Sequence, residues 1–233
     1  GNFTDSMIIK DEPVFSLRDA LAACSLGALE VIGSTYEVDI DAEDSRAESE
    51  DAIFKNITDW DEFTDVLLQP SENGVSLFKR CYLSQDGINI DKIPDDIFEL
   101  LSAGLLFSFC HNDKIRVVMP DEIKSLYKKY IDGGYDKKGE DIRLVAEYAE
   151  AAANLYGVIL KERFLELFKD YSGSKMSDEY IDELLKLGRS KLESYELEDG
   201  FIISNLLYED NQIKKSLLMD IASNSDKMYI PHK

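Results

Sequence analysis

Few residues of this sequence could do catalytic or metal chemistry through their side chains alone. The 233-residue chain has two histidines, His111 and His232, and three cysteines, Cys24, Cys81 and Cys110. The adjacent pair Cys110-His111 could bind a metal ion or act as a nucleophile and its base. Because neighbouring residues of a strand point to opposite faces, these two side chains would not converge on one ion without a bend. The sequence therefore predicts buried cysteines and a turn histidine, with no metal site.

Sequence motifs for catalysis are also missing. Phosphate-binding loops, dinucleotide fingerprints and nucleophile elbows do not occur. The run from Glu37 to Asp51 has eight acidic residues and one arginine, but it lacks the central glycine of a calcium-binding loop. We interpret it as a solvated loop and helix start. No catalytic, cofactor-binding or metal-binding residue is predicted, and we expect the protein not to be an enzyme.

The charge of the chain restricts its partners. Its 47 acidic and 26 basic residues give a formal net charge of −21, whereas affinity for nucleic acids depends on neutralising phosphates with Lys and Arg. Nucleic acid is therefore a disfavoured partner. No run of about 18 apolar residues could span a bilayer, so no membrane partner is expected. Few, scattered cysteines and no signal peptide favour reduced thiols and a cytoplasmic location.

The elements that would position any site begin with residues 94–131. Pro94 fits the first position of a short helix, and Gly104 can adopt the left-handed conformation that ends one. Apolar runs then flank Asn112-Asp113, a pair that tolerates turn geometry, and a second helix follows Pro120. A helix followed directly by a β-hairpin is typical of the second half of a winged helix.

The second half of the chain repeats this plan. Residues 183–188, Glu-Leu-Leu-Lys-Leu-Gly, resemble residues 99–104, Glu-Leu-Leu-Ser-Ala-Gly. A hairpin-like stretch follows here too, with its turn at Asp199-Gly200. Two tandem winged-helix-like units explain the repeat most simply, although ordinary helix packing could produce so short a match.

We thus predict a mainly α protein with small β-hairpins, in which an N-terminal helical module precedes two tandem winged-helix-like units. The predicted segments are a disordered N-terminus (1–15), a small helical module (16–58), two winged-helix-like domains (59–132 and 140–222) and an extended end (223–233) of a chain cut from a longer protein.

Four short motifs resemble the N-terminal half of a group of Firmicute proteins, several of which continue into a C-terminal SEC-C motif, a Cys-rich zinc site. The motifs are Leu-Leu-x-x-Gly-Leu-Leu-Phe, Val-Met-Pro-Asp-Glu-Ile, Tyr-Ala-Glu-Ala-x-x-Asn-Leu-Tyr-Gly-Val and Lys-Met-Tyr-Ile-Pro. The resemblance covers most of the chain from Ser16 onwards and supports the fold more than any function. The SEC-C cysteines are absent, so such a zinc site would lie beyond Lys233.

The first module, Ser16 to Ile57, resembles a SAP or Rho-N-terminal helix-extended-helix unit. Such units contact nucleic acid through basic residues near their second helix. This sequence instead has the acidic run Glu37 to Asp51 at that place. The resemblance therefore implies the fold of the module, while the departure argues against nucleic-acid binding by it.

Three functional hypotheses remain. The first is a non-enzymatic interaction or regulatory protein that docks another protein, or a further region of its own chain, through its winged-helix-like modules. The second is a DNA- or RNA-binding regulatory protein, and the third is an enzyme of unrecognised class. The second would depend on one set of cations: Lys124, Lys128, Lys129, Lys137, Lys138, Lys186, Arg189 and Lys191.

Overall fold

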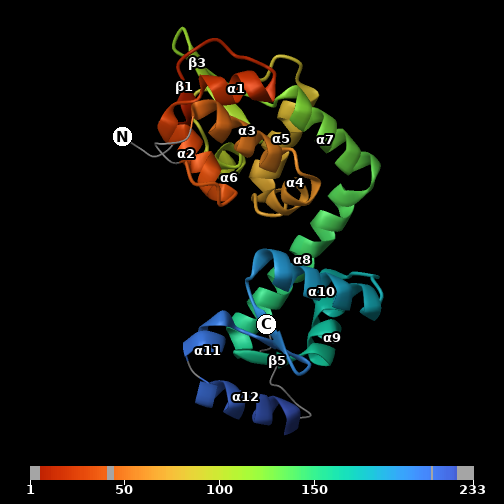
Figure 1. The fold of residues 1–233 in the computed structure, drawn as a ribbon. Coiled ribbons are helices and arrows are strands. Elements are labelled where there is room, and N and C mark those ends of the chain that lie inside the picture. Colours follow the sequence, from red (N-terminus) through yellow and green to blue (C-terminus); the bar gives the residue numbers. More distant parts are fainter. Residues whose placement is uncertain (1–5, 41–44, 211, 225–233) are drawn as a thin grey trace. The chain divides into compact units, whose positions relative to one another are not determined.

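The computed structural model describes residues 6–40, 45–210 and 212–224, which form two compact units, Gly1–Tyr135 and Asp136–Lys233 (Figure 1). Twelve α-helices and two small sheets occur within these described ranges. The prediction of a mainly helical chain with two small antiparallel hairpins is confirmed.

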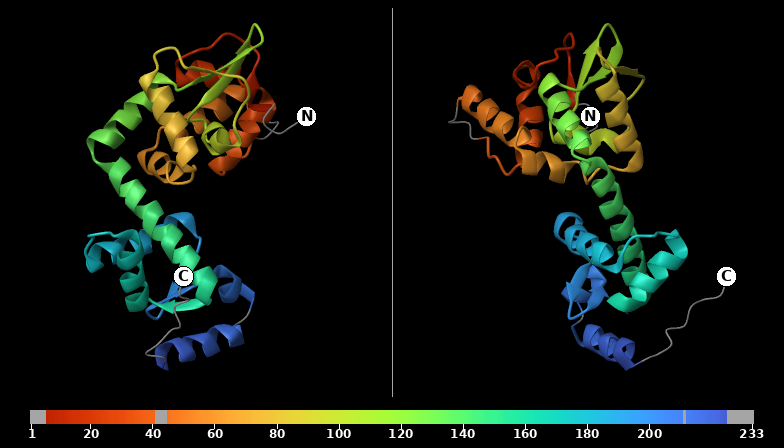
Figure 2. Two further views of the ribbon diagram at one scale, coloured as in Figure 1. Left: turned by 180° about the vertical axis from the view of Figure 1, so that it is seen from behind. Right: turned by 90° about the vertical axis from the view of Figure 1, so that its right-hand side faces the viewer.

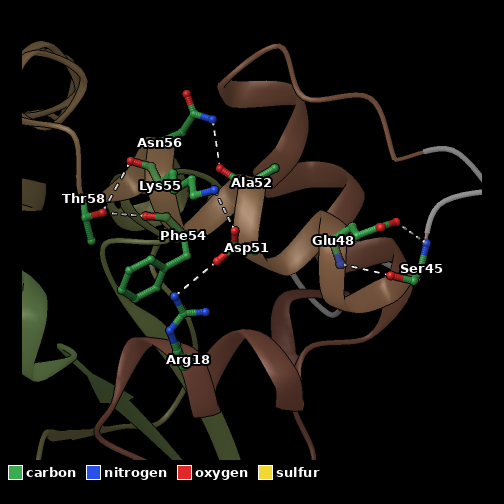
Figure 3. Close-up of polar contacts among 9 residues, drawn as sticks. All are labelled: Arg18, Ser45, Glu48, Asp51, Ala52, Phe54, Lys55, Asn56 and Thr58. Atoms are coloured by element: carbon green, nitrogen blue, oxygen red, sulfur yellow. Dashed lines mark hydrogen bonds and ion pairs between the residues drawn. The ribbon is translucent and has the colours of Figure 1, made fainter.

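Five helices of the first unit begin at a residue whose side chain caps free backbone N–H groups. Ser45 and Glu48 form a reciprocal capping box at the start of α3 (Figure 3). Hydroxyl or carboxylate oxygens of Ser16, Ser25, Asp59 and Ser71 accept from the first turn of four other helices. The five helices are α1 (Leu17–Ala23), α2 (Leu26–Thr35), α3 (Arg46–Ile57), α4 (Trp60–Val66) and α5 (Glu72–Leu83).

A four-stranded sheet with the order β1-β3-β4-β2 completes the first unit. Asn112 and Asp113 have φ values of 50° and 59°, so this pair forms the tight turn between β3 and β4. The tip of the hairpin projects from the unit beside the segment after β1 (Figure 2). The elements are β1 (Ile8–Ile9), β2 (Ile88–Ile90), the 3-10 helix η2 (Asp95–Ile97), α6 (Phe98–Ser102), β3 (Phe107–His111), β4 (Lys114–Val118) and α7 (Asp121–Asp132).

The expected disorder of residues 1–15 is wrong for residues 6–15, while residues 1–5 lie outside the described part. β1 pairs in parallel with β3, with Ile8 opposite Ser108. The Ser108 hydroxyl donates to the Met7 carbonyl at 2.8 Å, and Met7 and Ile9 are buried. Pairing with the edge of β3, which is distant in the sequence, thus orders this segment. No periodicity within residues 1–15 could reveal that pairing.

The first three helices share the core of the first unit. Leu17, Leu29 and Ile53 are fully buried in the same cluster as Phe78 and Val117. Residues 16–58 therefore pack as part of the larger unit and have no separate core.

The second unit has a three-stranded antiparallel sheet with the order β5-β7-β6. Its first strand was not predicted, because the three residues after Gly157 carry no pattern of their own and are fixed by pairing with β7. The elements are α8 (Tyr135–Tyr156), β5 (Val158–Leu160), α9 (Lys161–Ser172), α10 (Asp178–Leu192), β6 (Glu196–Glu198), β7 (Phe201–Ile203), α11 (Asn205–Asp210) and α12 (Gln212–Asn224). Most of the expected extended end, residues 225–233, lies outside the described part.

None of the helices in the described ranges combines the length and apolar character needed to cross a membrane.

Candidate functional site

The first unit contributes three of the predicted cationic residues, all on α7. Lys124 Nζ donates to the Ser84 carbonyl at 2.8 Å, and Lys128 Nζ lies 2.5 Å from Asp132 Oδ2. Lys129 Nζ lies 4.0 Å from the centre of the Trp60 ring, in cation–π geometry. Each of these ammonium groups therefore interacts with a neighbouring group of the protein.

The cations of the second unit are engaged by carboxylates. Lys137 Nζ lies 2.5 Å from Asp141 Oδ1, and Lys138 Nζ lies 2.8 Å from Glu183 Oε1. Lys186 pairs with Asp182 at 2.8 Å, and Arg189 pairs with Glu196 at 2.8 Å. Lys191 also interacts with a neighbouring group. These side chains do not form one unpaired basic surface.

The pKa shifts agree with this pairing. Hydrogen bonds from Lys161 and Lys186 lower the pKa of the Asp182 carboxyl. The hydrogen bond to Asp141 raises the pKa of Lys137, as the one to Asp132 does for Lys128. A phosphate would have to displace these carboxylates before it could use the cations.

The N-terminus of α10 is acidic and exposed. Ser177 Oγ accepts from the Tyr180 N–H, which caps the helix, and Asp178 and Glu179 occupy its first turn. Lys169 pairs with Asp178. Both acidic residues are favourable at the positive end of the helix dipole, so the dipole alone explains them. The same positions would repel a DNA phosphate.

The acidic run shows the same local use of charge. Asp51 Oδ1 accepts from Arg18 at 3.2 Å, and Asp51 Oδ2 lies 2.8 Å from Lys55 Nζ (Figure 3). The hydrogen bonds from Lys55 and Arg18 lower the pKa of Asp51. After the N-cap Ser45, residues 46–51 of the run form the first part of α3, and residues 41–44 lie outside the described ranges.

The pair Cys110-His111 does not converge. In the β3–β4 register Cys110 lies opposite Ile115 and His111 opposite Lys114, so their side chains are on different faces. Cys110 is half-buried, which corrects the expectation that all three thiols are buried. Cys24 and Cys81 are buried, and burial raises the pKa of each thiol to about 12. No group of metal-ligating side chains occurs in the part of the chain that the structure describes.

A groove of about 460 Å³ on the first unit was missed by the sequence analysis. The signal was present in the alternation of β3 and β4, which places every second residue on one face. The turn at Asn112-Asp113 fixes which residues lie opposite each other. The groove's lining includes the extended segment at Glu12, Pro13 and Phe15, and hairpin residues that are basic or aromatic: Phe109, His111, Lys114 and Arg116.

No family model matches this chain, and neither a curated protein nor a solved structure matches it significantly.

Proposed function

We propose that this chain is a non-enzymatic interaction protein, which docks a basic protein segment through winged-helix-like units. The order of elements in the second unit supports this proposal. Helix α8, strand β5, helices α9 and α10, and strands β6 and β7 follow one another, with β7 between β5 and β6 in the sheet. This is the order of secondary structure in a winged helix, with α10 in the place of the recognition helix.

The first unit has a shorter version of the same element order, which supports the tandem interpretation. Its α5, β2, η2 with α6, β3 and β4 follow the same order, and β4 lies between β2 and β3. β1 is an addition to this plan, at the outer edge of β3. Such folds bind DNA, RNA or protein, so the choice among partners rests on the side chains.

The observation that favours a protein partner over nucleic acid is that the candidate cations already interact with neighbouring groups of the chain. On the second unit, carboxylates of the same unit lie within 2.8 Å of Lys137, Lys138 and Lys186. Glu179 is exposed at the start of α10 and forms no ion pair within the described ranges, and Asp178, which pairs with Lys169, is exposed beside it. An acidic helix start on a chain of net charge −21 attracts a Lys- and Arg-rich segment and repels phosphates.

The nucleic-acid alternative is tested by titrating the chain with random-sequence duplex DNA at about physiological salt. We expect binding no tighter than roughly 100 µM, the weak limit of ordinary non-specific affinity. The dissociation constant can be measured by fluorescence anisotropy. A value of about 1 µM or lower would replace the protein-docking proposal with the nucleic-acid one.

The docking proposal itself is tested with a Lys- and Arg-rich peptide and the double variant D178N/E179Q. We expect the wild-type affinity to fall with added salt, and the variant to bind several-fold more weakly because two charges are lost at the helix start. The control E147Q/E150Q removes two exposed charges from α8 of the same unit and should bind as wild type. Equal losses in the two variants would point to general charge attraction and contradict docking at α10.

A further inference from the structure

The groove beside the β3–β4 hairpin has an arrangement that the proposed docking function does not use. Phe109 lies opposite Arg116 in the register, and His111 lies opposite Lys114. Because directly opposed residues of antiparallel strands share a face, these four side chains lie on one face of the hairpin. Asn89 of β2 lies opposite Arg116 from the other side. The register therefore brings the basic groups of two strands to one wall.

The second wall is apolar. Pro13 and Phe15 belong to the extended segment after β1, and both line the groove. A hydrogen bond from the Asp121 N–H to the Phe15 carbonyl, of 2.8 Å, anchors the end of this segment. Phe109, fully buried, lies at the base of the hairpin face. A ligand in this groove would contact apolar surface on one side and charge on the other.

The cations of the groove differ from those of α7 and of the second unit, which interact with neighbouring groups. In the described ranges neither Lys114 nor Arg116 forms an ion pair, and the contact of Arg116 is a 3.1 Å hydrogen bond from its Nε to Asn89 Oδ1. That bond holds one edge of the planar guanidinium and leaves its two terminal nitrogens as paired donors, the geometry suited to a carboxylate or phosphate. On so acidic a chain, two unpaired cations in one groove favour an anionic ligand.

Acidic residues also line the groove, and they restrict where an anion can sit. Glu12 Oε1 lies 3.6 Å from His111 Nε2, and its side chain is 76% exposed. Asp86 lies two residues before the start of β2 in the chain. Since the strand order is β3-β4-β2, the cations of β4 lie between these two acids. An anion is therefore favoured in the middle of the groove and disfavoured at its ends.

We propose that this groove binds a small organic anion, a carboxylate or phosphate attached to a flat apolar group. Arg116 and Lys114 bind the anionic group, and Pro13 and Phe15 contact the apolar group. A volume of about 460 Å³ is in the range of small-molecule pockets and accommodates a ligand with one ring.

The test uses the full chain and four probes in ligand-detected NMR titrations: phenylacetate, phenyl phosphate, benzylammonium and inorganic phosphate. We expect roughly millimolar binding of the two aromatic anions, in keeping with the few atoms of each. Benzylammonium has the same ring with the opposite charge and should bind at least about fivefold more weakly. Inorganic phosphate should also bind more weakly, because it gains nothing from the apolar wall. Preference for one aromatic anion identifies the anionic group, and either preference supports the proposal.

Variants locate the site. Arg116→Gln and Lys114→Gln should each weaken binding of the aromatic anions by about tenfold, the usual effect of losing a charge-assisted hydrogen bond. Lys128→Gln removes one charge from α7 of the same unit, outside the groove, and should leave binding unchanged. Circular dichroism verifies that each variant is folded.

Three results would overturn the proposal. They are no binding of either aromatic anion at about 20 mM, benzylammonium binding as tightly as the anions, and undiminished binding by both groove variants. Each would leave the docking of a basic segment at α10 unaffected, because that site lies on the second unit.

Discussion

At Gly104, both the backbone conformation and the packed core oppose a larger side chain. Gly104 has a φ of 65°, and a Cβ there would lie 2.5 Å from Ile57 Cδ1. The left-handed conformation alone costs an L-residue about 1–2 kcal/mol, and crowding of a packed core adds about 1–3 kcal/mol. Gly104 thus ends α6 and also permits the close approach of α3.

We therefore predict that Gly104→Ala lowers the free energy of unfolding of the first unit by about 2–5 kcal/mol. Urea unfolding followed by circular dichroism measures the loss. Gly134→Ala is the matched control, because Gly134 has a φ of 74° and nothing within 4 Å of an added Cβ. It should cost only the conformational part, about 1–2 kcal/mol. Equal losses would show that the contact with Ile57 relaxes at no cost.

Asp141 is the buried carboxylate of the second unit. Only 5% exposed, it accepts from Lys137 at 2.5 Å and from the Tyr180 hydroxyl at 3.1 Å, so it joins α8 to α10. We predict that Asp141→Ala destabilises the chain by about 1–3 kcal/mol, since the tyrosine hydroxyl loses its acceptor. Lys137→Gln should cost less than about 1 kcal/mol, because the lysine side chain is mostly exposed. Thermal unfolding ranks the two variants, and a larger loss in Lys137→Gln would contradict this assignment.

At the scale of elements, the pairing of Asp182 makes stability depend on acidity. Lys161 begins α9 and Lys186 lies on α10, and hydrogen bonds from both lower the pKa of Asp182 in the folded state. A lowered folded pKa means that the stabilisation is present above the unfolded value, about 3.9, and is lost as the pH falls through the folded one. We predict that Asp182→Asn is less stable than wild type at pH 7 and that the difference shrinks below about pH 4. Urea midpoints at pH 7, 5 and 3 measure it, and a difference independent of pH would exclude an ionic origin.

Among the strands, the two hairpins could be predicted from the sequence, but β1, β2 and β5 could not. The hairpins β3–β4 and β6–β7 were predicted because Asn112-Asp113 and Asp199-Gly200 have local turn chemistry. Strands β1, β2 and β5 were not predicted, since two or three residues carry no alternation and are defined by their partners.

The candidate cations could be named from the sequence, but their pairing was only partly visible there. The i,i+4 spacing of Lys137 with Asp141, and of Asp182 with Lys186, predicts helical ion pairs. Lys138 and Glu183 are 45 positions apart, and their contact depends on how α8 packs against α10. The groove required the hairpin register, which the turn at Asn112-Asp113 fixes, and also the course of residues 12–15, which no local pattern supplies.

For the whole molecule, the net charge lowers the stability of the folded state, whereas local ion pairs raise it. Exposed ion pairs contribute about 0.2–1 kcal/mol each, and salt weakens them. The excess of 47 acidic over 26 basic residues repels itself in the compact state, and salt weakens that repulsion too. Because 21 charges remain uncompensated, we expect repulsion to dominate.

We therefore predict that raising NaCl from about 20 mM to about 500 mM at pH 7 increases the melting temperature by a few degrees, as the Debye length falls from roughly 20 Å to about 4 Å. Differential scanning fluorimetry measures the shift. The matched measurement is at about pH 4.4, the sequence pI, where the net charge is close to zero and the salt effect should be much weaker. A melting temperature that falls with salt at pH 7 would mean that the ion pairs outweigh the repulsion. The surface would then be less available to a basic partner than its charge implies, because its carboxylates would already be committed to cations of this chain.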